Sequence, residues 1–124
     1  MNKLFLVIVL FSSFYSYSCS TLLDTKMRLL DSTEELNLCE YQDNVLLIVN
    51  VASRCGYTPQ YNDLQKIWSD YKGKNVIIIG VPTNNFKQEP GSNKEIKNFC
   101  ETNFGVNFPM TEKTNVIGKE AHPF

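Results

Sequence analysis

The sequence has a single histidine, a single tryptophan and no marked excess of either charge. One histidine excludes a metal centre built from several imidazole ligands. The 12 Lys and Arg residues against 13 Asp and Glu residues give a formal net charge of -1, so no overall basic field attracts nucleic acid. Internal repeats, low-complexity segments and a glycine-rich phosphate-binding loop are also missing from the sequence. These absences exclude repeat proteins and the common nucleotide-binding motifs.

What is present suits one packed domain. A chain of 124 residues leaves no room for two domains. Hydrophobic residues make up 43% of the sequence and charged residues 20%, which excludes a disordered, collagen-like or coiled-coil chain. We therefore expect a single globular domain with its own core.

The first 20 residues differ in character from the rest of the chain. They carry one charge, Lys3, followed by an unbroken apolar run over residues 4–11 and a stretch rich in Ser and Tyr. A basic start, a short apolar run and an exit of small residues are typical of a secretory signal peptide. The apolar run is too short for a comfortable membrane span. We therefore predict a signal peptide over residues 1–20, a domain over residues 21–124, and export to the periplasm or the cell exterior.

Two features of this segment leave alternatives open. Cleavage is expected near Ser18 or Ser20, since both residues are small. The residues before Cys19 form a poor lipoprotein signal, so a lipid on that cysteine is the less favoured fate. A buried N-terminal strand is the alternative to a signal peptide.

The apolar patterns of the remaining chain predict an α/β fold. Short runs rich in β-branched residues predict strands over 44–51 and 75–81, and the first is expected to be covered on both faces. Apolar residues recur at spacings of three and four from Tyr61 to Tyr71, which predicts a helix with Thr58 as its N-cap. A strand, a helix and a strand in this order form a βαβ unit with parallel strands.

Weaker patterns complete the expected fold. Ser92 to Glu95 has the form of a capping box and predicts the start of a second helix. Short strands are expected near 27–30 and 36–38, and a third strand of the sheet is expected near 114–117.

Cys55 is the residue that points to chemistry. It follows the first apolar strand and precedes the expected helix N-terminus, whose unpaired N–H groups and dipole favour a thiolate over a thiol. Arg54 adds a neighbouring positive charge, unless its side chain points elsewhere. Because a thiolate is a nucleophile, Cys55 is the candidate reactive residue. The alternative is an inert small residue packed at the end of a strand.

The spacing after Cys55 narrows the chemistry. Thioredoxin-like redox sites carry Cys-x-x-Cys at a strand-to-helix junction, whereas this chain has Thr58 at the second position. A hydroxyl cannot close a local disulfide, which favours a single nucleophilic thiol whose partner lies elsewhere. Zinc is disfavoured, because Cys39, Cys55 and Cys100 form no Cys-x-x-Cys pair.

Four segments, in the right order, resemble the signatures of the glutathione peroxidase family. They are residues 50–58, 79–86, 88–92 and 108–110, and the similarity runs from about residue 25 to Phe124. The resemblance implies a thioredoxin-like fold, with a mixed sheet flanked by helices. It also implies a thiol-dependent reduction of hydrogen peroxide or organic hydroperoxides, in response to oxidative stress.

The resemblance also assigns roles to particular residues. The family's nucleophile falls on Cys55, which would attack the peroxide O–O bond and become a sulfenic acid. The family's catalytic glutamine falls on Asn85, whose amide is one methylene shorter. The resemblance implies that this amide polarises the sulfur or the peroxide. Residues 99–104 resemble the segment that carries the resolving cysteine of thioredoxin-dependent members, which falls on Cys100. Helical spacing alone makes Cys100 a core residue instead, and we expect the second helix to unwind partly if Cys100 resolves.

Two further expectations concern parts of the family pattern that this sequence lacks or changes. The family's Trp-Asn-Phe motif is not found in the sequence, and Trp68 is better interpreted as a core residue of the first helix. We therefore expect the C-terminal strand and helix of the fold to be missing, as in a fragment or a truncated enzyme. Cys39 has no partner at a useful spacing and is interpreted as a core residue, and His122 is interpreted as structural.

The sequence thus predicts a peroxidase without a metal or organic cofactor. A thioredoxin-like protein is the expected reductant because a resolving cysteine is present, with glutathione as the alternative. A thiol–disulfide oxidoreductase and a non-catalytic redox sensor or remnant are the competing functions. No nucleic-acid partner and no stable membrane span after signal cleavage are expected.

Overall fold

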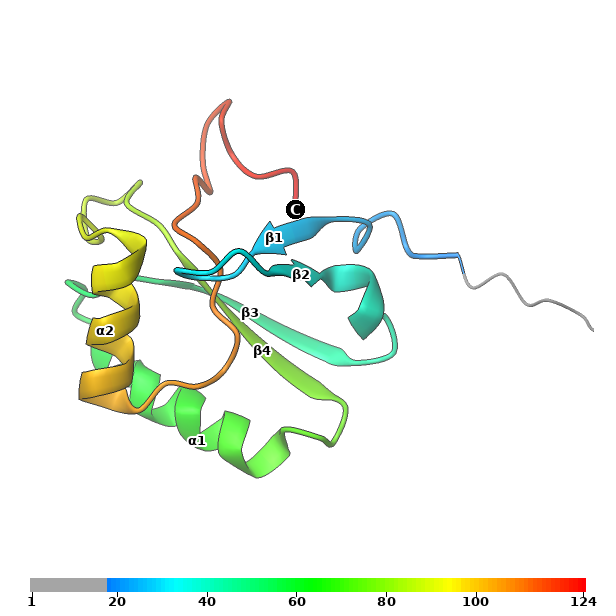
Figure 1. Ribbon diagram of the computed structural model, residues 1–124, viewed down its shortest axis with the longest axis horizontal. Coiled ribbons are helices and arrows are strands. Elements are labelled where there is room, and N and C mark those ends of the chain that lie inside the picture. The colour runs from blue at the N-terminus through cyan, green and yellow to red at the C-terminus, as the bar shows by residue number, and fades with distance from the viewer. Residues whose placement is uncertain (1–17) are drawn as a thin grey trace, which may run out of the picture.

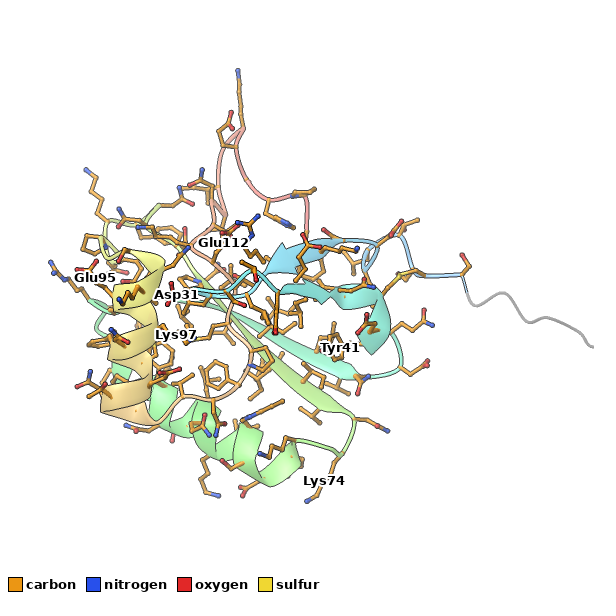
Figure 2. The ribbon with its side chains drawn as sticks, in the orientation of Figure 1. Asp31, Tyr41, Lys74, Glu95, Lys97 and Glu112 are labelled. Carbon is orange, nitrogen blue, oxygen red and sulfur yellow. A yellow bond between two sulfur atoms is a disulfide. The ribbon has the colours of Figure 1, made fainter. Side chains whose placement is uncertain are left out.

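The computed structural model describes residues 18–124, so most of the expected signal peptide lies outside the described residues. Figure 1 shows a central pair of strands with two helices and a small hairpin packed around it. Charged side chains of both signs are spread over the surface, among them Lys74, Glu95 and Glu112 (Figure 2). Between residues 18 and 124, no helix combines the length and the apolar character that crossing a bilayer requires.

The predicted βαβ unit is confirmed. Strand β3 (Val45–Val51) and strand β4 (Val76–Pro82) pair in parallel, and helix α1 (Tyr61–Tyr71) lies between them in sequence. Strand β4 is covered on both faces, because Ile78 packs into the cluster that the helices cover and Ile79 packs into the cluster under the hairpin. Alternation along this strand therefore divides the core into two layers.

Strand β3 is less covered than the sequence predicts. Val45 is 66% exposed and Leu47 is 37% exposed. Val49 and Val51 pack into one core cluster and Ile48 packs against the other, so both faces are covered only in part. The reason is topological: β3 pairs with β4 along one edge, and no described strand pairs with its other edge. The position of the strand in the chain is correct, but an apolar run cannot reveal how many neighbours a strand has.

The second layer is built by the N-terminal hairpin. Strands β1 (Lys26–Arg28) and β2 (Glu35–Asn37) pair antiparallel, close to the positions predicted for them. A short 3-10 helix, η1 (Leu38–Tyr41), follows β2 directly. Leucines and a methionine of this region pack under the hairpin against β4; they are Met27, Leu36 and Leu38.

Helix α2 (Asn93–Phe104) begins at the predicted capping box. The Ser92 hydroxyl accepts a hydrogen bond from the Glu95 backbone N–H at 3.3 Å, and the Glu95 carboxylate accepts one from the Ser92 N–H at 2.7 Å. Hydrogen bonding to Ser92 lowers the pKa of the exposed Glu95 carboxyl group. The helix ends at Gly105, whose φ of 61° is left-handed and suits a residue without a Cβ.

The strand predicted near residues 114–117 is wrong in position. Pairing occurs earlier, as isolated bridges from Gly80 to Met110 and from Leu29 to Thr111. Beyond them, the Val116 backbone N–H donates to the side chain of Asn85 at 2.7 Å, so a side chain takes the place of a ladder partner. Gly80 permits the close approach, since a Cβ there would lie 3.2 Å from Met110 Cγ.

Candidate active site

Cys55 lies at the junction between β3 and α1. It is half-buried and lines a small hollow of about 50 Å³ at the end of β3. Its sulfur accepts a hydrogen bond from the Tyr57 backbone N–H at 3.4 Å. The structure therefore places the predicted nucleophile where it is accessible and faces a backbone donor.

Thr58 fixes the loop that carries Cys55, but in a different way from the predicted N-cap. Residues Thr58–Gln60 form a 3-10 turn (η2) ahead of α1, and Gln60 occupies the cap position of that helix. The Thr58 hydroxyl accepts a hydrogen bond from the Cys55 N–H at 3.0 Å and donates one to the Ala52 carbonyl at 2.9 Å. The Thr58 hydroxyl therefore links the backbone on either side of the turn, at Ala52 and at Cys55. An N-cap prediction does not anticipate these two bonds.

Glu89 is a functional candidate that the sequence did not reveal as such. Its side chain is 1% exposed, and one carboxylate oxygen accepts hydrogen bonds from the Ser53 N–H at 2.6 Å and the Ser53 hydroxyl at 2.9 Å. In addition, the Arg54 N–H donates to the Gln88 carbonyl at 3.0 Å. Two consecutive residues just before Cys55 are thus bonded to the loop that follows β4.

The backbone of Glu89 is hydrogen-bonded at both its N–H and its carbonyl. Its N–H donates to the Asn84 side-chain oxygen at 3.0 Å. The Lys113 ammonium donates to the Gly91 carbonyl at 2.6 Å and to the Glu89 carbonyl at 3.5 Å. Motif similarity identified the segment around Glu89, but a sequence shows neither burial nor which backbone groups a carboxylate accepts from.

Arg54 is oriented toward the second helix. Its charge contributes to lowering the pKa of Glu95, and the two residues line the same surface hollow. The hollow that contains Cys55 does not include Arg54 in its lining. Arg54 thus lines a hollow beside the start of α2, and its effect on the sulfur remains a prediction.

Asn85 is ordered by a network of its own. Its side-chain oxygen accepts from the Thr83 hydroxyl at 2.9 Å and from the Val116 N–H at 2.7 Å. The amide nitrogen donates to the Asn115 side chain at 3.3 Å. The amide thus binds the loop after β4 to the C-terminal segment, and its predicted role at the sulfur remains a prediction.

Cys100 lies in the core beside Tyr61. It is 1% exposed and belongs to the cluster that α1 and α2 cover, together with Tyr61 and Ile96. Burial raises the pKa of the Cys100 thiol above its ordinary value of 9.0, and the Tyr61 hydroxyl opposes that rise. Burial and the nearby Cys100 also raise the pKa of Tyr61. The core interpretation of Cys100 thus fits the folded state, in which the thiol is neutral.

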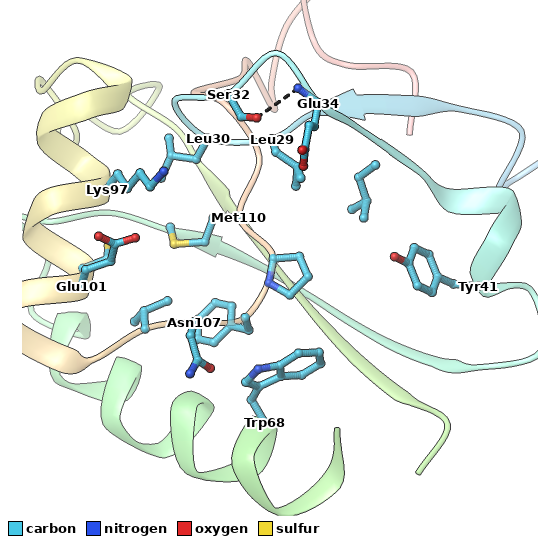
Figure 3. Close-up of a pocket in the computed structure, with 15 residues that line it drawn as sticks. Leu29, Leu30, Ser32, Glu34, Tyr41, Trp68, Lys97, Glu101, Asn107 and Met110 are labelled. Atoms are coloured by element: carbon cyan, nitrogen blue, oxygen red, sulfur yellow. Dashed lines mark hydrogen bonds between the residues drawn. The ribbon is translucent and has the colours of Figure 1, made fainter. Parts of the chain in front are cut away.

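The two thiols line different hollows. Cys100 lines a hollow of about 540 Å³ enclosed by the hairpin, the two helices and residues 106–110 (Figure 3). Trp68 lines that hollow from α1 and packs against the core, which confirms its predicted structural role. Tyr61 lines the hollow of Cys55 and packs in the same core cluster as Cys100. That α2 unwinds to bring Cys100 to Cys55 remains a prediction.

This placement predicts different reactivities for the two thiols. Near neutral pH, Cys100 should react with N-ethylmaleimide more than about tenfold more slowly than Cys55, because burial keeps it protonated and shielded. Its rate should keep rising with pH beyond the ordinary thiol pKa, because burial raises the pKa of Cys100. Because the folded-state pKa of Cys100 is raised, its contribution to stability is fully present below the unfolded-state pKa and is lost as the pH rises through the folded-state pKa. Peptide mapping after timed labelling measures both rates; equal rates in the native protein would contradict the burial of Cys100.

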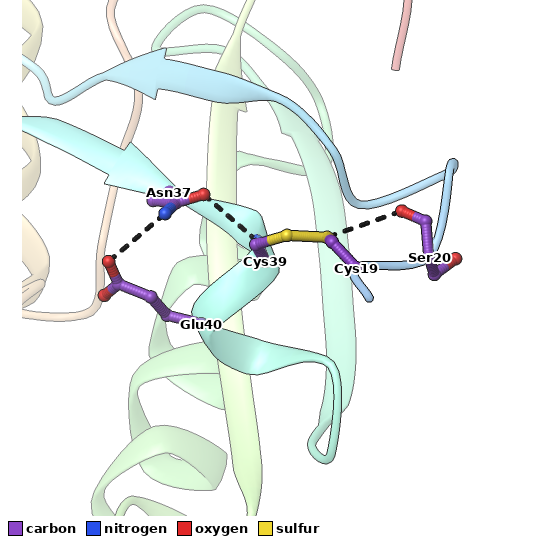
Figure 4. Close-up of a disulfide and its surroundings, with 5 residues drawn as sticks. All are labelled: Cys19, Ser20, Asn37, Cys39 and Glu40. Carbon is purple, nitrogen blue, oxygen red and sulfur yellow. Dashed lines mark hydrogen bonds between the residues drawn. A yellow bond between two sulfur atoms is a disulfide. The ribbon is translucent and has the colours of Figure 1, made fainter. Parts of the chain in front are cut away.

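The prediction that Cys39 is an unpaired core residue is wrong. Cys39 is half-buried and forms a disulfide with Cys19 across a Cα–Cα distance of 5.6 Å (Figure 4). The antiparallel pairing of β1 and β2 explains the contact, because it returns the residues after β2 toward those before β1. A separation of 20 residues in the sequence gives no sign of this proximity.

His122 has the structural environment that the sequence predicts. Its backbone N–H donates to the Asn115 carbonyl at 2.9 Å, and its ring accepts from the Phe124 N–H at 3.2 Å. Both contacts lie within the C-terminal segment and involve no sulfur. The ring therefore supports local chain folding.

Taken together, the fold and the site define a thioredoxin-like protein with one cysteine at the strand–helix junction. A family model described as "Glutathione peroxidase" matches residues 22–124. The chain belongs to the glutathione peroxidase family, as its sequence motifs predicted.

Individual relatives agree with this assignment. The chain is 55% identical over 91 residues to a "Glutathione peroxidase homolog BsaA" of Halalkalibacterium halodurans, covering 73% of this chain and 58% of that protein. It is 51% identical over 87 residues to a "Hydroperoxy fatty acid reductase gpx1" of Synechocystis sp., covering 69% of this chain and 52% of that protein. A "Thioredoxin/glutathione peroxidase BtuE" of Escherichia coli is 48% identical over 73% of this chain and 50% of its own length. The chain thus spans little more than half the length of these relatives.

Solved structures confirm the thioredoxin-like fold. A crystal structure described as "Trgpx in apo form" superposes with a TM-score of 0.59 and 31% sequence identity. The match covers 86% of this chain and 61% of that chain.

Proposed function

We propose that this protein is a thiol-dependent peroxidase that reduces hydrogen peroxide or organic hydroperoxides, with Cys55 as nucleophile. The observation that carries the proposal is the half-exposed Cys55 sulfur at the end of β3, facing the Tyr57 N–H in a chain of this family. The names of two relatives, a hydroperoxy fatty acid reductase and a thioredoxin/glutathione peroxidase, support the same reaction class.

The first step needs only groups that the chain provides and the substrate. The Cys55 thiolate attacks one oxygen of the hydroperoxide, so an S–O bond forms as the O–O bond breaks. The sulfur is oxidised by two electrons to a sulfenic acid, and the departing oxygen takes a proton to leave as water or an alcohol. The hydrogen bonds of Thr58 and Glu89 hold the cysteine loop before the substrate arrives, which lowers the cost of ordering it during the reaction.

In the second step, the Cys100 thiol attacks the sulfenic sulfur, which forms a disulfide and releases water. A thioredoxin-like dithiol protein then reduces that disulfide by exchange, and glutathione is the alternative electron donor. Because the two thiols line different hollows, the last turns of α2 must open for this step. Opening exposes Cys100 and removes the burial that raises its pKa, so its thiolate fraction rises when it is needed.

Trapping of the sulfenic acid tests the first step directly. The purified chain, treated with one equivalent of hydroperoxide and dimedone, should gain one dimedone adduct on Cys55. Consumption of peroxide at the expense of reduced thioredoxin, faster than with glutathione, supports the full cycle. Reduction of insulin without any turnover of peroxide favours the thiol–disulfide oxidoreductase instead. Absence of both activities and of the adduct favours a non-catalytic role.

The Cys100→Ser variant tests the resolving role. It should keep the first oxidation of Cys55 at a rate within about twofold of the wild type, because Cys100 does not line the Cys55 hollow. Turnover with thioredoxin should fall by about tenfold or more, because no internal disulfide forms. Non-reducing peptide mapping measures the Cys55–Cys100 link. A link from Cys55 to another cysteine of the same chain in this variant would contradict the assignment.

We also propose that the chain is exported, as its N-terminal sequence predicts. The Cys19–Cys39 disulfide supports export, because disulfides persist in oxidising compartments and are rare in reducing ones. An exported peroxidase of this type requires a reductant supplied in the same compartment. Separation of cell fractions, with detection of the chain in the periplasm or medium, tests this proposal.

A further inference from the structure

Cys19 has three possible fates in an exported chain, and the sequence alone does not choose among them. Small residues at the first and third positions before a bond mark a signal-peptidase site. Ser16 and Ser18 satisfy this requirement for cleavage after Ser18, and Ser18 and Ser20 satisfy it for cleavage after Ser20. Cleavage after Ser20 discards Cys19, whereas lipidation would occupy its sulfur as a thioether.

The structure gives that sulfur a different partner. Cys19 and Cys39 are joined by a disulfide, and their Cα–Cα distance of 5.6 Å lies in the usual range for such a bond. The Cys39 N–H donates to the Asn37 side chain at 3.3 Å, which fixes the residue at the start of η1 (Figure 4). The hairpin thus fixes the position of Cys39, and the chain before β1 places Cys19 next to Cys39.

The residues that follow Cys19 are also bound to the domain. The Leu23 N–H donates to the Ser20 carbonyl at 2.9 Å, and the Leu38 N–H donates to the Thr25 carbonyl at 3.1 Å. Leu23 packs against the apolar cluster under the hairpin. The segment from Cys19 to Thr25 therefore belongs to the folded domain.

We propose that the signal peptide is cleaved after Ser18, so that Cys19 becomes the first residue of the mature chain and forms a disulfide with Cys39. This inference rests on the proposed export. Cleavage after Ser20 would leave Cys39 without its partner and free the N-terminal end of the hairpin segment. A thioether to lipid would prevent the disulfide, since one sulfur cannot form both bonds.

Formation of this disulfide requires an oxidant in the compartment to which the protein is exported. Two thiols lose two protons and two electrons as the S–S bond forms. A protein disulfide of the compartment accepts the electrons by exchange and leaves as a dithiol. Cys19, Asp24 and Cys39 lie close enough together to hold a metal ion. Once the disulfide has formed, neither sulfur is a thiolate, so neither can serve as a metal ligand.

The test uses the 124-residue chain with its own N-terminal leader, expressed in a bacterium that exports it. Intact mass and peptide mapping of the exported protein, without reduction, give its first residue and its linked cysteines. We expect a chain that begins at Cys19. After denaturation it should have two maleimide-reactive thiols before reduction, Cys55 and Cys100, and four after reduction.

A matched pair of leader variants separates the two cleavage sites. Ser20→Lys places a large charged residue only at the site after Ser20, so processing should continue and give a chain that begins at Cys19. Ser16→Lys affects only the site after Ser18, so the uncleaved chain should accumulate. Maturation of Ser16→Lys to a chain that begins at Thr21 would overturn the proposal.

Other outcomes of the experiment would also overturn the proposed cleavage site. A wild-type chain that begins at Thr21, or one with three reactive thiols before reduction, overturns it, as does a mass increase that matches a lipid. An uncleaved wild-type chain retained in the cytosol overturns both export and this cleavage. In that case, oxidation of the same purified chain in a glutathione redox buffer tests the Cys19–Cys39 bond separately from export.

Discussion

Replacing Cys55 with serine is expected to lower peroxide consumption by about a thousandfold or more, to the rate measured without protein. The sulfur is the only group in the small hollow at the end of β3 that becomes oxidised in the proposed step. A serine hydroxyl stays protonated at neutral pH and accepts no oxygen from a peroxide, so the neighbouring hydrogen bonds cannot compensate for the lost sulfur. The measurement is single-turnover peroxide loss, together with the yield of the dimedone adduct.

Stability provides the control for this variant. Cys55 is half-buried and close in size to serine, so the melting temperature should stay within a few degrees of the wild type. A folded Cys55→Ser protein without activity locates the chemistry on the sulfur. If this folded variant still consumed peroxide at the wild-type rate and formed an adduct elsewhere, the assignment of Cys55 would be abandoned.

The parts of the fold that the sequence predicts well are those set by local rules. Strands β3 and β4 follow from β-branched apolar runs, and α2 follows from the Ser92–Glu95 capping box. Each of these signals lies within one stretch of chain, so no knowledge of the tertiary arrangement is needed. The position of Cys55 before α1 follows from the same local pattern.

The predictions that failed concern contacts between segments that are distant in the sequence. The Cys19–Cys39 bond depends on how the hairpin returns, and the bond from Glu89 to Ser53 joins residues 36 apart. Thr58 binds the Cys55 N–H because a 3-10 turn precedes α1, a distinction that propensity cannot make. The family resemblance aligned the segments containing these residues, but their contacts come only from the structure.

Replacing Glu89 with alanine should give the largest loss of stability among single changes near the site. The Ser53 N–H and hydroxyl both lose their acceptor in a half-buried loop, and the vacated space lies in the interior. Hydrogen bonds to a carboxylate contribute about 1.5–3 kcal/mol each, and an unsatisfied buried donor costs about 1–3 kcal/mol. Because these contributions overlap, we expect the free energy of unfolding to fall by about 2–4 kcal/mol, measured by urea denaturation.

The effect on chemistry should be separable from the effect on folding. At a temperature where Glu89→Ala remains folded, oxidation of Cys55 by peroxide should slow by about tenfold, because the loop before the sulfur is less well positioned. Glu89→Gln keeps an oxygen acceptor of the same length and should lose less on both measures. Ser53→Ala removes only the hydroxyl bond and keeps the bond from the Ser53 N–H, so its loss of stability should be near 1 kcal/mol, about the net contribution of one hydrogen bond. If Glu89→Ala matched the wild type in both stability and oxidation rate, Glu89 would have no part in holding the cysteine loop.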